Sequence, residues 1–206
     1  MNTGNTCAGL EIKHINAEAP FAYMYSLQYK LQARLGKLPP ANTSAAEATS
    51  EIIYWNYCIQ DECVELLNWL EIPGAKFIEL EMEVIDILHF AMNIGIALKL
   101  SEAEVQEFAC GFTWLVGNRP IDYEELCAYT QGLMISITKL INQLPWKSWK
   151  TYSPEADGRE FAAQNFAQVL YSIFTLACRL GMDEQKVINY YCAKNLENHA
   201  RQDRGY

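Results

Sequence analysis

Apolar residues recur at intervals of three and four along nearly the whole chain of 206 residues. This spacing gives a helix one apolar face. It predicts helices over 21–35, 46–70, 77–100, 122–144 and 159–180, a short helix after the capping-box pattern of Ser101, and a last helix from Asp183 toward Asp203. No stretch alternates apolar and polar residues as a half-buried strand does. The sequence therefore predicts one all-α helical bundle, preceded by a loose lead-in over residues 1–20.

The predicted helices fall into two halves with the same order of elements, about 46–110 and 122–203. Residues 65–70 of the first half parallel 139–144 of the second, but a lysine begins the second segment where a glutamate begins the first. We expect a degenerate duplicated helix-pair module in which only the first half keeps acidic side chains. A chance similarity between two amphipathic helix pairs is the alternative.

Composition and charge limit the class of protein. Half of the residues are apolar and a fifth are charged, which is ordinary for a globular protein. The net charge of −9 disfavours a nucleic-acid backbone as the main partner, although bound metal can still admit a nucleotide substrate. Seven scattered cysteines without a C-x-x-C pair indicate reduced thiols in a cytoplasmic protein. No stretch approaches the length of a membrane span.

Two carboxylate pairs stand on consecutive predicted helices. They read Glu62-x-x-Glu65 and Glu83-x-x-Asp86, and residues three apart share a helix face. The turn signal at 73–74 lets the chain reverse, so the pairs can meet. Like charges about 4 Å apart repel by roughly 4 kcal/mol at an effective dielectric of about 20. Protonation, basic partners or a cation must compensate, and all-oxygen ligands suit Mg²⁺ or Mn²⁺. The alternative is that these acids face solvent.

A second group of polar residues fits a phosphorylated ligand. Lys194, Asn198 and Arg201 lie at i, i+4 and i+7 on one face of the last helix, and such a stripe suits phosphate oxygens. A solvated basic helix end, favourable to the helix dipole, is the alternative. Asn93 lies two turns after Asp86, on nearly the same face.

Three further features have both a functional and a structural interpretation. Gln28 and Gln32, one turn apart, could bind a base edge, but glutamines are common on exposed helix faces. The Trp-Lys-Ser-Trp-Lys run at 146–150 fits a phosphate-contacting lid or a loop anchored by its tryptophans. His89, one turn after the second acid pair, is expected to be a core histidine with its hydrogen bonds satisfied rather than a ligand.

Taken in order, these motifs resemble the all-α nucleoside triphosphate pyrophosphohydrolases, which include the dimeric dUTPases and the MazG-like enzymes. The two acid pairs look like that family's metal signature, and residues 27–31 resemble the first-helix pattern of dimeric dUTPases. The tail over 194–206 is similar to the closing motif of phage enzymes that hydrolyse both dCTP and dUTP. In related phage enzymes the Trp-Lys run lies between the acid pairs, whereas here it lies in the second half.

The resemblance implies Mg²⁺-dependent hydrolysis of dUTP, dCTP or both, and of the diphosphates, to the monophosphate, with Mn²⁺ as a possible substitute. It also implies a homodimer and, for a phage protein, the host cytoplasm. One acid, with Glu62 the candidate, would orient the attacking water. Because an amide can flip, a site built on Gln28 could bind uracil or cytosine. The implied metal ligands are Glu62, Glu65, Glu83 and Asp86; the implied phosphate ligands are Lys194 and Arg201; the implied sugar or base ligands are Gln28, Asn93 and Asn198.

Two other classes of protein share parts of this pattern. A di-iron carboxylate bundle requires a Glu-x-x-His motif on each of two helices, and Asp86-x-x-His89 supplies only one such pair. A non-catalytic helical interaction module would carry the acids as a solvated face. It predicts that metal does not affect stability, and it leaves the tail motif unexplained.

Overall fold

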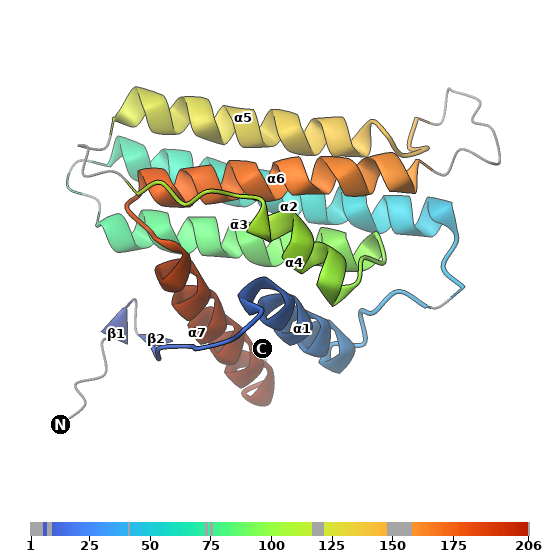
Figure 1. Ribbon diagram of the computed structural model, residues 1–206, viewed down its shortest axis with the longest axis horizontal. Coiled ribbons are helices and arrows are strands. Elements are labelled where there is room, and N and C mark those ends of the chain that lie inside the picture. The colour runs from blue at the N-terminus through green and yellow to red at the C-terminus, as the bar shows by residue number, and fades with distance from the viewer. Residues whose placement is uncertain are drawn as a thin grey trace.

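The computed structural model describes residues 6–7, 10–40, 42–72, 74, 76–116, 122–147 and 158–205. These residues form seven helices and one short strand pair (Figure 1). The helices are α1 (Pro20–Arg34), α2 (Ala45–Glu71), α3 (Phe77–Ala97), α4 (Glu102–Cys110), α5 (Tyr123–Ile141), α6 (Arg159–Arg179) and α7 (Glu184–Asp203). The all-α fold predicted from the apolar spacing is confirmed. None of the helices in these ranges is long and apolar enough to cross a membrane.

Four long helices, α2, α3, α5 and α6, lie side by side as a bundle, and α1 and α7 cross it on the α3 side (Figure 1). Every residue of α3 from Leu80 to Ala97 is buried except Asp86 and Phe90. A helix that is apolar on nearly all sides packs at the centre of a fold, because it has no polar face that could be exposed to solvent. Its Gly95 lets the rings of Tyr25 and Phe166 approach, since an added Cβ would lie 3.1 Å and 3.2 Å from them.

The helix ends follow the capping chemistry of the sequence. Ser101 forms a complete capping box with Glu104, and the Asp183 carboxylate accepts the Lys186 backbone N–H at 2.7 Å. Lys99, with a φ of 57°, ends α3 in the left-handed conformation. The backbone N–H groups of Lys99 and Leu100 donate to the carbonyls of Ile96 and Gly95, so these carbonyls in the last turn of α3 have hydrogen-bond partners.

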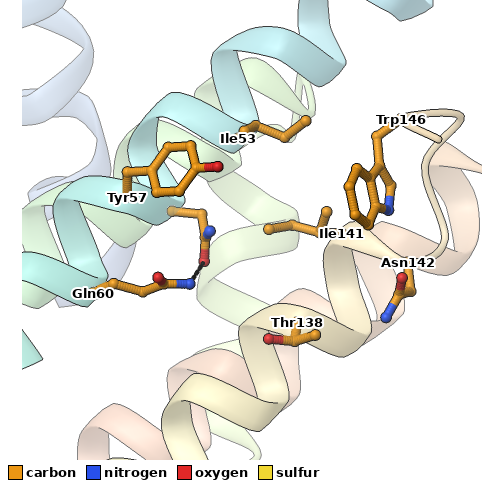
Figure 2. Close-up of a pocket in the computed structure, with 8 residues that line it drawn as sticks. Ile53, Tyr57, Gln60, Thr138, Ile141, Asn142 and Trp146 are labelled. Atoms are coloured by element: carbon orange, nitrogen blue, oxygen red, sulfur yellow. Dashed lines mark hydrogen bonds between the residues drawn. The ribbon is translucent and has the colours of Figure 1, made fainter. Parts of the chain in front are cut away.

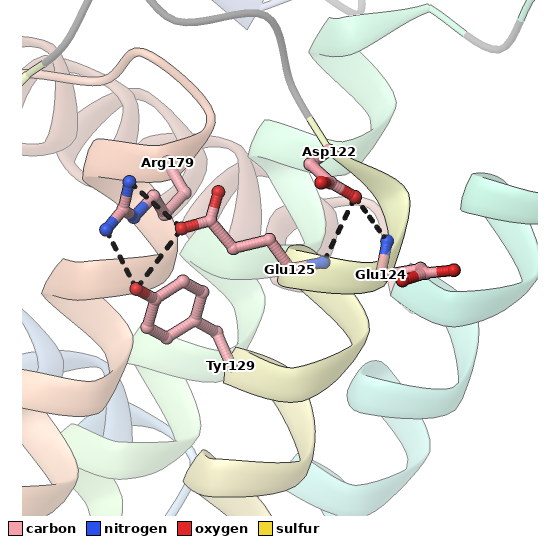
Figure 3. Close-up of polar contacts among 5 residues, drawn as sticks. All are labelled: Asp122, Glu124, Glu125, Tyr129 and Arg179. Atoms are coloured by element: carbon pink, nitrogen blue, oxygen red, sulfur yellow. Dashed lines mark hydrogen bonds and ion pairs between the residues drawn. The ribbon is translucent and has the colours of Figure 1, made fainter.

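The start of α5 is capped and also tied to α6 (Figure 3). Asp122 accepts the backbone N–H groups of Glu124 and Glu125 at 2.9 and 3.4 Å. The Glu125 side chain does not complete a capping box but pairs with Arg179 of α6 at 3.1 Å. Arg179 also donates to the Tyr129 hydroxyl at 2.8 Å. These contacts hold α5 and α6 together at one end of the bundle.

The lead-in before α1 is more structured than the sequence predicted. Strands β1 (Thr6–Cys7) and β2 (Leu10–Glu11) pair antiparallel, with Thr6 opposite Glu11. Pro20 begins α1 rather than preceding it, because the first helical position needs no N–H donor. The two-residue strands are too short to give a visible alternation in the sequence. Of the turn at 73–74, only Gly74 is described, and it has a left-handed φ of 79°.

Candidate functional site

Three of the four predicted acids meet at the contact between α2 and α3. Glu62, Glu83 and Asp86 each offer a carboxylate oxygen, and these oxygens lie within 4.8 Å of one another. The Trp69 indole N–H of α2 donates to Glu83 at 3.0 Å, which fixes that carboxylate. Glu65 is exposed on α2 and lies outside this group, although its charge acts on Glu62 and Glu83. The three meeting acids are called the acid cluster below.

The acid cluster has an unfavourable charge when no cation is bound. Burial raises the pKa of Glu62 from its usual 4.5 to about 8, and the hydrogen bond with Glu83 and the charge of Asp86 act in the same direction. Burial also raises the pKa of Glu83. A divalent cation would remove both the repulsion and the cost of burying charge. Three converging carboxylates therefore fit the Mg²⁺ or Mn²⁺ ion that the sequence predicts.

Helix α7 brings positive charge to this face of α3. The Lys194 ammonium lies 2.5 Å from an Asp86 carboxylate oxygen. Two turns earlier on α7, Lys186 pairs with the buried Glu81 at 2.5 Å. These two ion pairs set the position of α7 along α3, so that the predicted Lys194 stripe faces the acid cluster.

A pocket of about 320 Å³ opens beside the acid cluster, between α1, α2, α3 and α7. Aromatic rings from Tyr54, Trp55 and Phe90 give it apolar walls. Of the nine predicted site residues, Glu83 and Glu65 do not line it. The seven that do are Gln28, Glu62, Asp86, Asn93, Lys194, Asn198 and Arg201. The structure thus brings together residues that are up to 173 positions apart in the chain, from Gln28 to Arg201.

At the end of the pocket near Gln28, buried amides form a closed network. Gln28 donates to the Asn93 side-chain oxygen at 2.8 Å. Its own oxygen accepts from Asn195 at 3.3 Å and from the Tyr191 hydroxyl at 3.4 Å. The amide of Gln28 is therefore fixed in one orientation. Tyr191 and Asn195 were not predicted as members of this network, although Asn195 stands within the tail motif.

His89 differs from the satisfied core histidine that the sequence predicts. Its ring is buried, stacks on Tyr191 with centroids 3.9 Å apart, and bonds through Nδ1 to the Ile85 carbonyl at 2.9 Å. Its Nε2 atom is buried without a hydrogen-bond partner, and the residue lines the pocket. Burial lowers the pKa of His89 to about 4, so the ring is neutral at physiological pH.

The Trp-Lys run at 146–150 is described only at its beginning. Trp146 lines a different hollow of about 180 Å³, on the opposite face of α2, together with Tyr57 and side chains of α5 (Figure 2). Lys147 lies over the Trp146 ring, 5.2 Å from its centroid. Among the described residues, those that line this hollow are neither acidic nor basic. Trp149 and Lys150 lie outside the described residues.

The two alternative interpretations of the acid pairs, a di-iron bundle and a non-catalytic interaction module, fit this geometry less well. The acid cluster contains no histidine, whereas a di-iron bundle needs two as ligands. An interaction module with solvated acids would leave Glu83 exposed, but Glu83 is 9% exposed and hydrogen-bonded to Trp69.

One comparison with known proteins assigns the chain to a family. The sequence model of a dUTPase family matches residues 22–206. This range covers every predicted site residue and all seven helices except the first two residues of α1. Comparison with curated proteins gave no match.

Proposed function

The chain belongs to the dUTPase family, and from this premise we propose that it hydrolyses dUTP, dCTP or both to the monophosphate and pyrophosphate with Mg²⁺. Family membership makes it a pyrophosphatase of nucleoside triphosphates. The finer assignment is supported by one observation: a single pocket combines carboxylates, basic side chains and amides. These are the groups needed at the metal, phosphate and base ends of such a substrate.

At the metal end, Glu62, Glu83 and Asp86 would hold the cation. Glu65, whose charge acts on Glu62 and Glu83 from outside this group, stays a predicted fourth ligand. A bound Mg²⁺ supplies charge for the phosphate oxygens and lowers the pKa of a coordinated water. Glu62 approaches from α2, opposite the α3 pair, and is the side chain that we assign to orienting the attacking water and accepting its proton.

At the phosphate end, Lys194 and Arg201 would bind the triphosphate. Both line the pocket from α7, and seven residues of helix separate them by about 10 Å along the axis. Lys194 already lies beside the acid cluster. The charge of the two side chains and the planar fork of arginine suit an extended polyphosphate.

At the other end, the network of Gln28 and Asn93 would support the base. Because three hydrogen bonds fix the Gln28 amide, this side chain does not flip to suit a second base. A preference between uracil and cytosine would then come from other groups that face the pocket, Asn198 among them. Association of two chains as a homodimer stays a prediction from the resemblance.

The proposal is tested by measuring pyrophosphate release from dUTP, dCTP, dTTP and dATP, each with Mg²⁺ and with a chelator. We expect Mg²⁺-dependent release from dUTP or dCTP and much slower release from dTTP and dATP. Equal rates with the chelator would exclude the metal role of the acid cluster. No release from any nucleotide would exclude the proposed activity and favour a non-catalytic role.

A further inference from the structure

Two buried polar atoms of the described residues have no hydrogen-bond partner: Oε1 of Gln32 and Nε2 of His89. Both residues line the pocket beside the acid cluster. Leaving a buried polar atom unpaired is unfavourable, so such atoms are rare in folded proteins. Two such atoms in one pocket indicate that a ligand supplies the missing partners.

The hydrogen bond made by Nδ1 fixes what His89 offers to a ligand. A backbone carbonyl can only accept, so the Nδ1 atom that contacts Ile85 carries the proton. The other nitrogen of a neutral ring then has a lone pair and acts as an acceptor. Stacking on Tyr191 prevents the ring from turning away. His89 therefore holds a rigid acceptor that suits an O–H or N–H donor.

The position of His89 along α3 indicates which part of a nucleotide it meets. Asp86 of the acid cluster precedes it by about 4.5 Å of helix axis, and Asn93 of the amide network follows it by about 6 Å. A nucleotide with its phosphates at the acid cluster and its base at the amide network has its sugar between them. The one free hydroxyl of a deoxyribose in a nucleoside triphosphate is the 3′-hydroxyl, which is a donor.

Building on the function proposed above, we propose that His89 Nε2 accepts a hydrogen bond from the 3′-hydroxyl of the bound deoxynucleotide. The contact positions the sugar and distinguishes a 3′-hydroxyl from a 3′-deoxy sugar. Gln32 of α1 supplies a second acceptor in the same pocket, but a single hydroxyl proton bonds mainly one of them. The fixed ring of His89 suits that contact better than the longer glutamine side chain.

The test uses binding, so that it does not depend on turnover. Titration calorimetry would compare dUMP and dCMP with their 2′,3′-dideoxy counterparts on the full chain. We expect the dideoxy compound to bind the wild type about tenfold more weakly, because it leaves Nε2 unpaired. His89→Phe keeps a ring to stack on Tyr191 but has no acceptor, and we expect it to bind the two compounds equally. Gln32→Met should keep the tenfold difference.

Three results of the comparison between the two compounds would overturn the proposal. They are equal binding of the two compounds by the wild type, a difference that persists in His89→Phe, or a difference lost only in Gln32→Met. Circular dichroism would show whether His89→Phe folds. If it does not, the comparison of the two compounds on the wild type still tests the proposal. Failure of this inference leaves hydrolysis of dUTP or dCTP intact, whereas failure of the proposed function shows as absent turnover. A protein that binds neither monophosphate overturns the inference.

Discussion

At the scale of single residues, the site is governed by charge that is buried before a ligand arrives. Glu62 and Glu83 have raised pKa values, and Lys194 offsets only Asp86. The negative charge that Lys194 does not compensate lowers the free energy of unfolding relative to a variant with a neutral side chain at the same position. This cost is the reason to expect a strong response to divalent cations.

The first prediction concerns pH. Folding raises the pKa of Glu62 from 4.5 to about 8, so the folded chain holds an extra proton between these values. The contribution of Glu62 protonation to the free energy of unfolding is therefore fully present below about pH 4.5, and it is lost as the pH rises toward 8. In chelator, Glu62→Gln should match the wild type near pH 5. At pH 8 it should be more stable by about 2 kcal/mol after solvent screening, or about 4–8 °C in Tm.

Thermal unfolding of both proteins across this pH range, with and without Mg²⁺, measures the effect. Using the difference between the two proteins removes the contribution of other groups, such as Asp203, whose pKa is lowered by Arg34. Added Mg²⁺ should raise the Tm of the wild type more than that of the variant. A difference independent of pH would show that Glu62 does not titrate as described.

At the scale of helices, α7 contributes to the pocket with its last turns and to the core with its first ones. Its last buried residue is Asn195, whereas Asn198, Arg201 and Gln202 line the pocket. The i, i+4, i+7 stripe seen in the sequence therefore identified a real helix face. The pattern could not show what the face meets, because that depends on how α7 packs on α3.

The second prediction follows from this division of α7. A chain that ends after Glu197 loses the pocket-lining turns but keeps the buried part of the helix. We expect it to fold and its KM to rise about 10–100-fold, since bonds to charged groups are each worth about 1.5–3 kcal/mol. Arg204→Ala is the matched control, because Arg204 pairs with Glu197 and does not line the pocket. An unchanged KM in the truncated chain would remove the last turns from the site.

The third prediction separates stability from activity at the start of α5. Asp122→Ala removes the side-chain acceptor that caps this helix (Figure 3). The free energy of unfolding should fall by about 1 kcal/mol, and Tm by about 2–4 °C. Asp122→Asn keeps an acceptor and should restore most of the loss. Because Asp122 does not line the pocket, kcat/KM should not change in either variant; a loss of activity would contradict this placement.

At the scale of the whole molecule, the sequence predicted helices well and the site in part. The three-residue spacing and the turn signal predicted that four acids meet, and three of them, Glu62, Glu83 and Asp86, do so. That Glu65 stays exposed depends on the rotation of α2 against α3, which the spacing does not determine. The unpaired Nε2 atom of His89 was not predicted, because a single histidine on an apolar helix gives no sign of which nitrogen lacks a partner.

The pocket itself lay beyond sequence reasoning, because its walls come from four helices at distant places in the chain. For Trp146 the sequence left two interpretations open, a phosphate-contacting lid and a loop anchored by its tryptophans. Trp146 lines a hollow on the other face of α2 (Figure 2). The duplicated halves and the homodimer stay predictions, since no contact described above depends on either.

The most direct test of the acid cluster is pyrophosphate release from dUTP and dCTP by Glu83→Gln with saturating Mg²⁺. Glutamine can still accept the Trp69 N–H, so the fold should be retained while a metal ligand loses its charge. The control Glu107→Gln removes an exposed acid of α4. We predict a loss of about a hundredfold or more in kcat for Glu83→Gln and none for the control. A near-normal rate for Glu83→Gln would contradict the assignment of the acid cluster as the catalytic metal site.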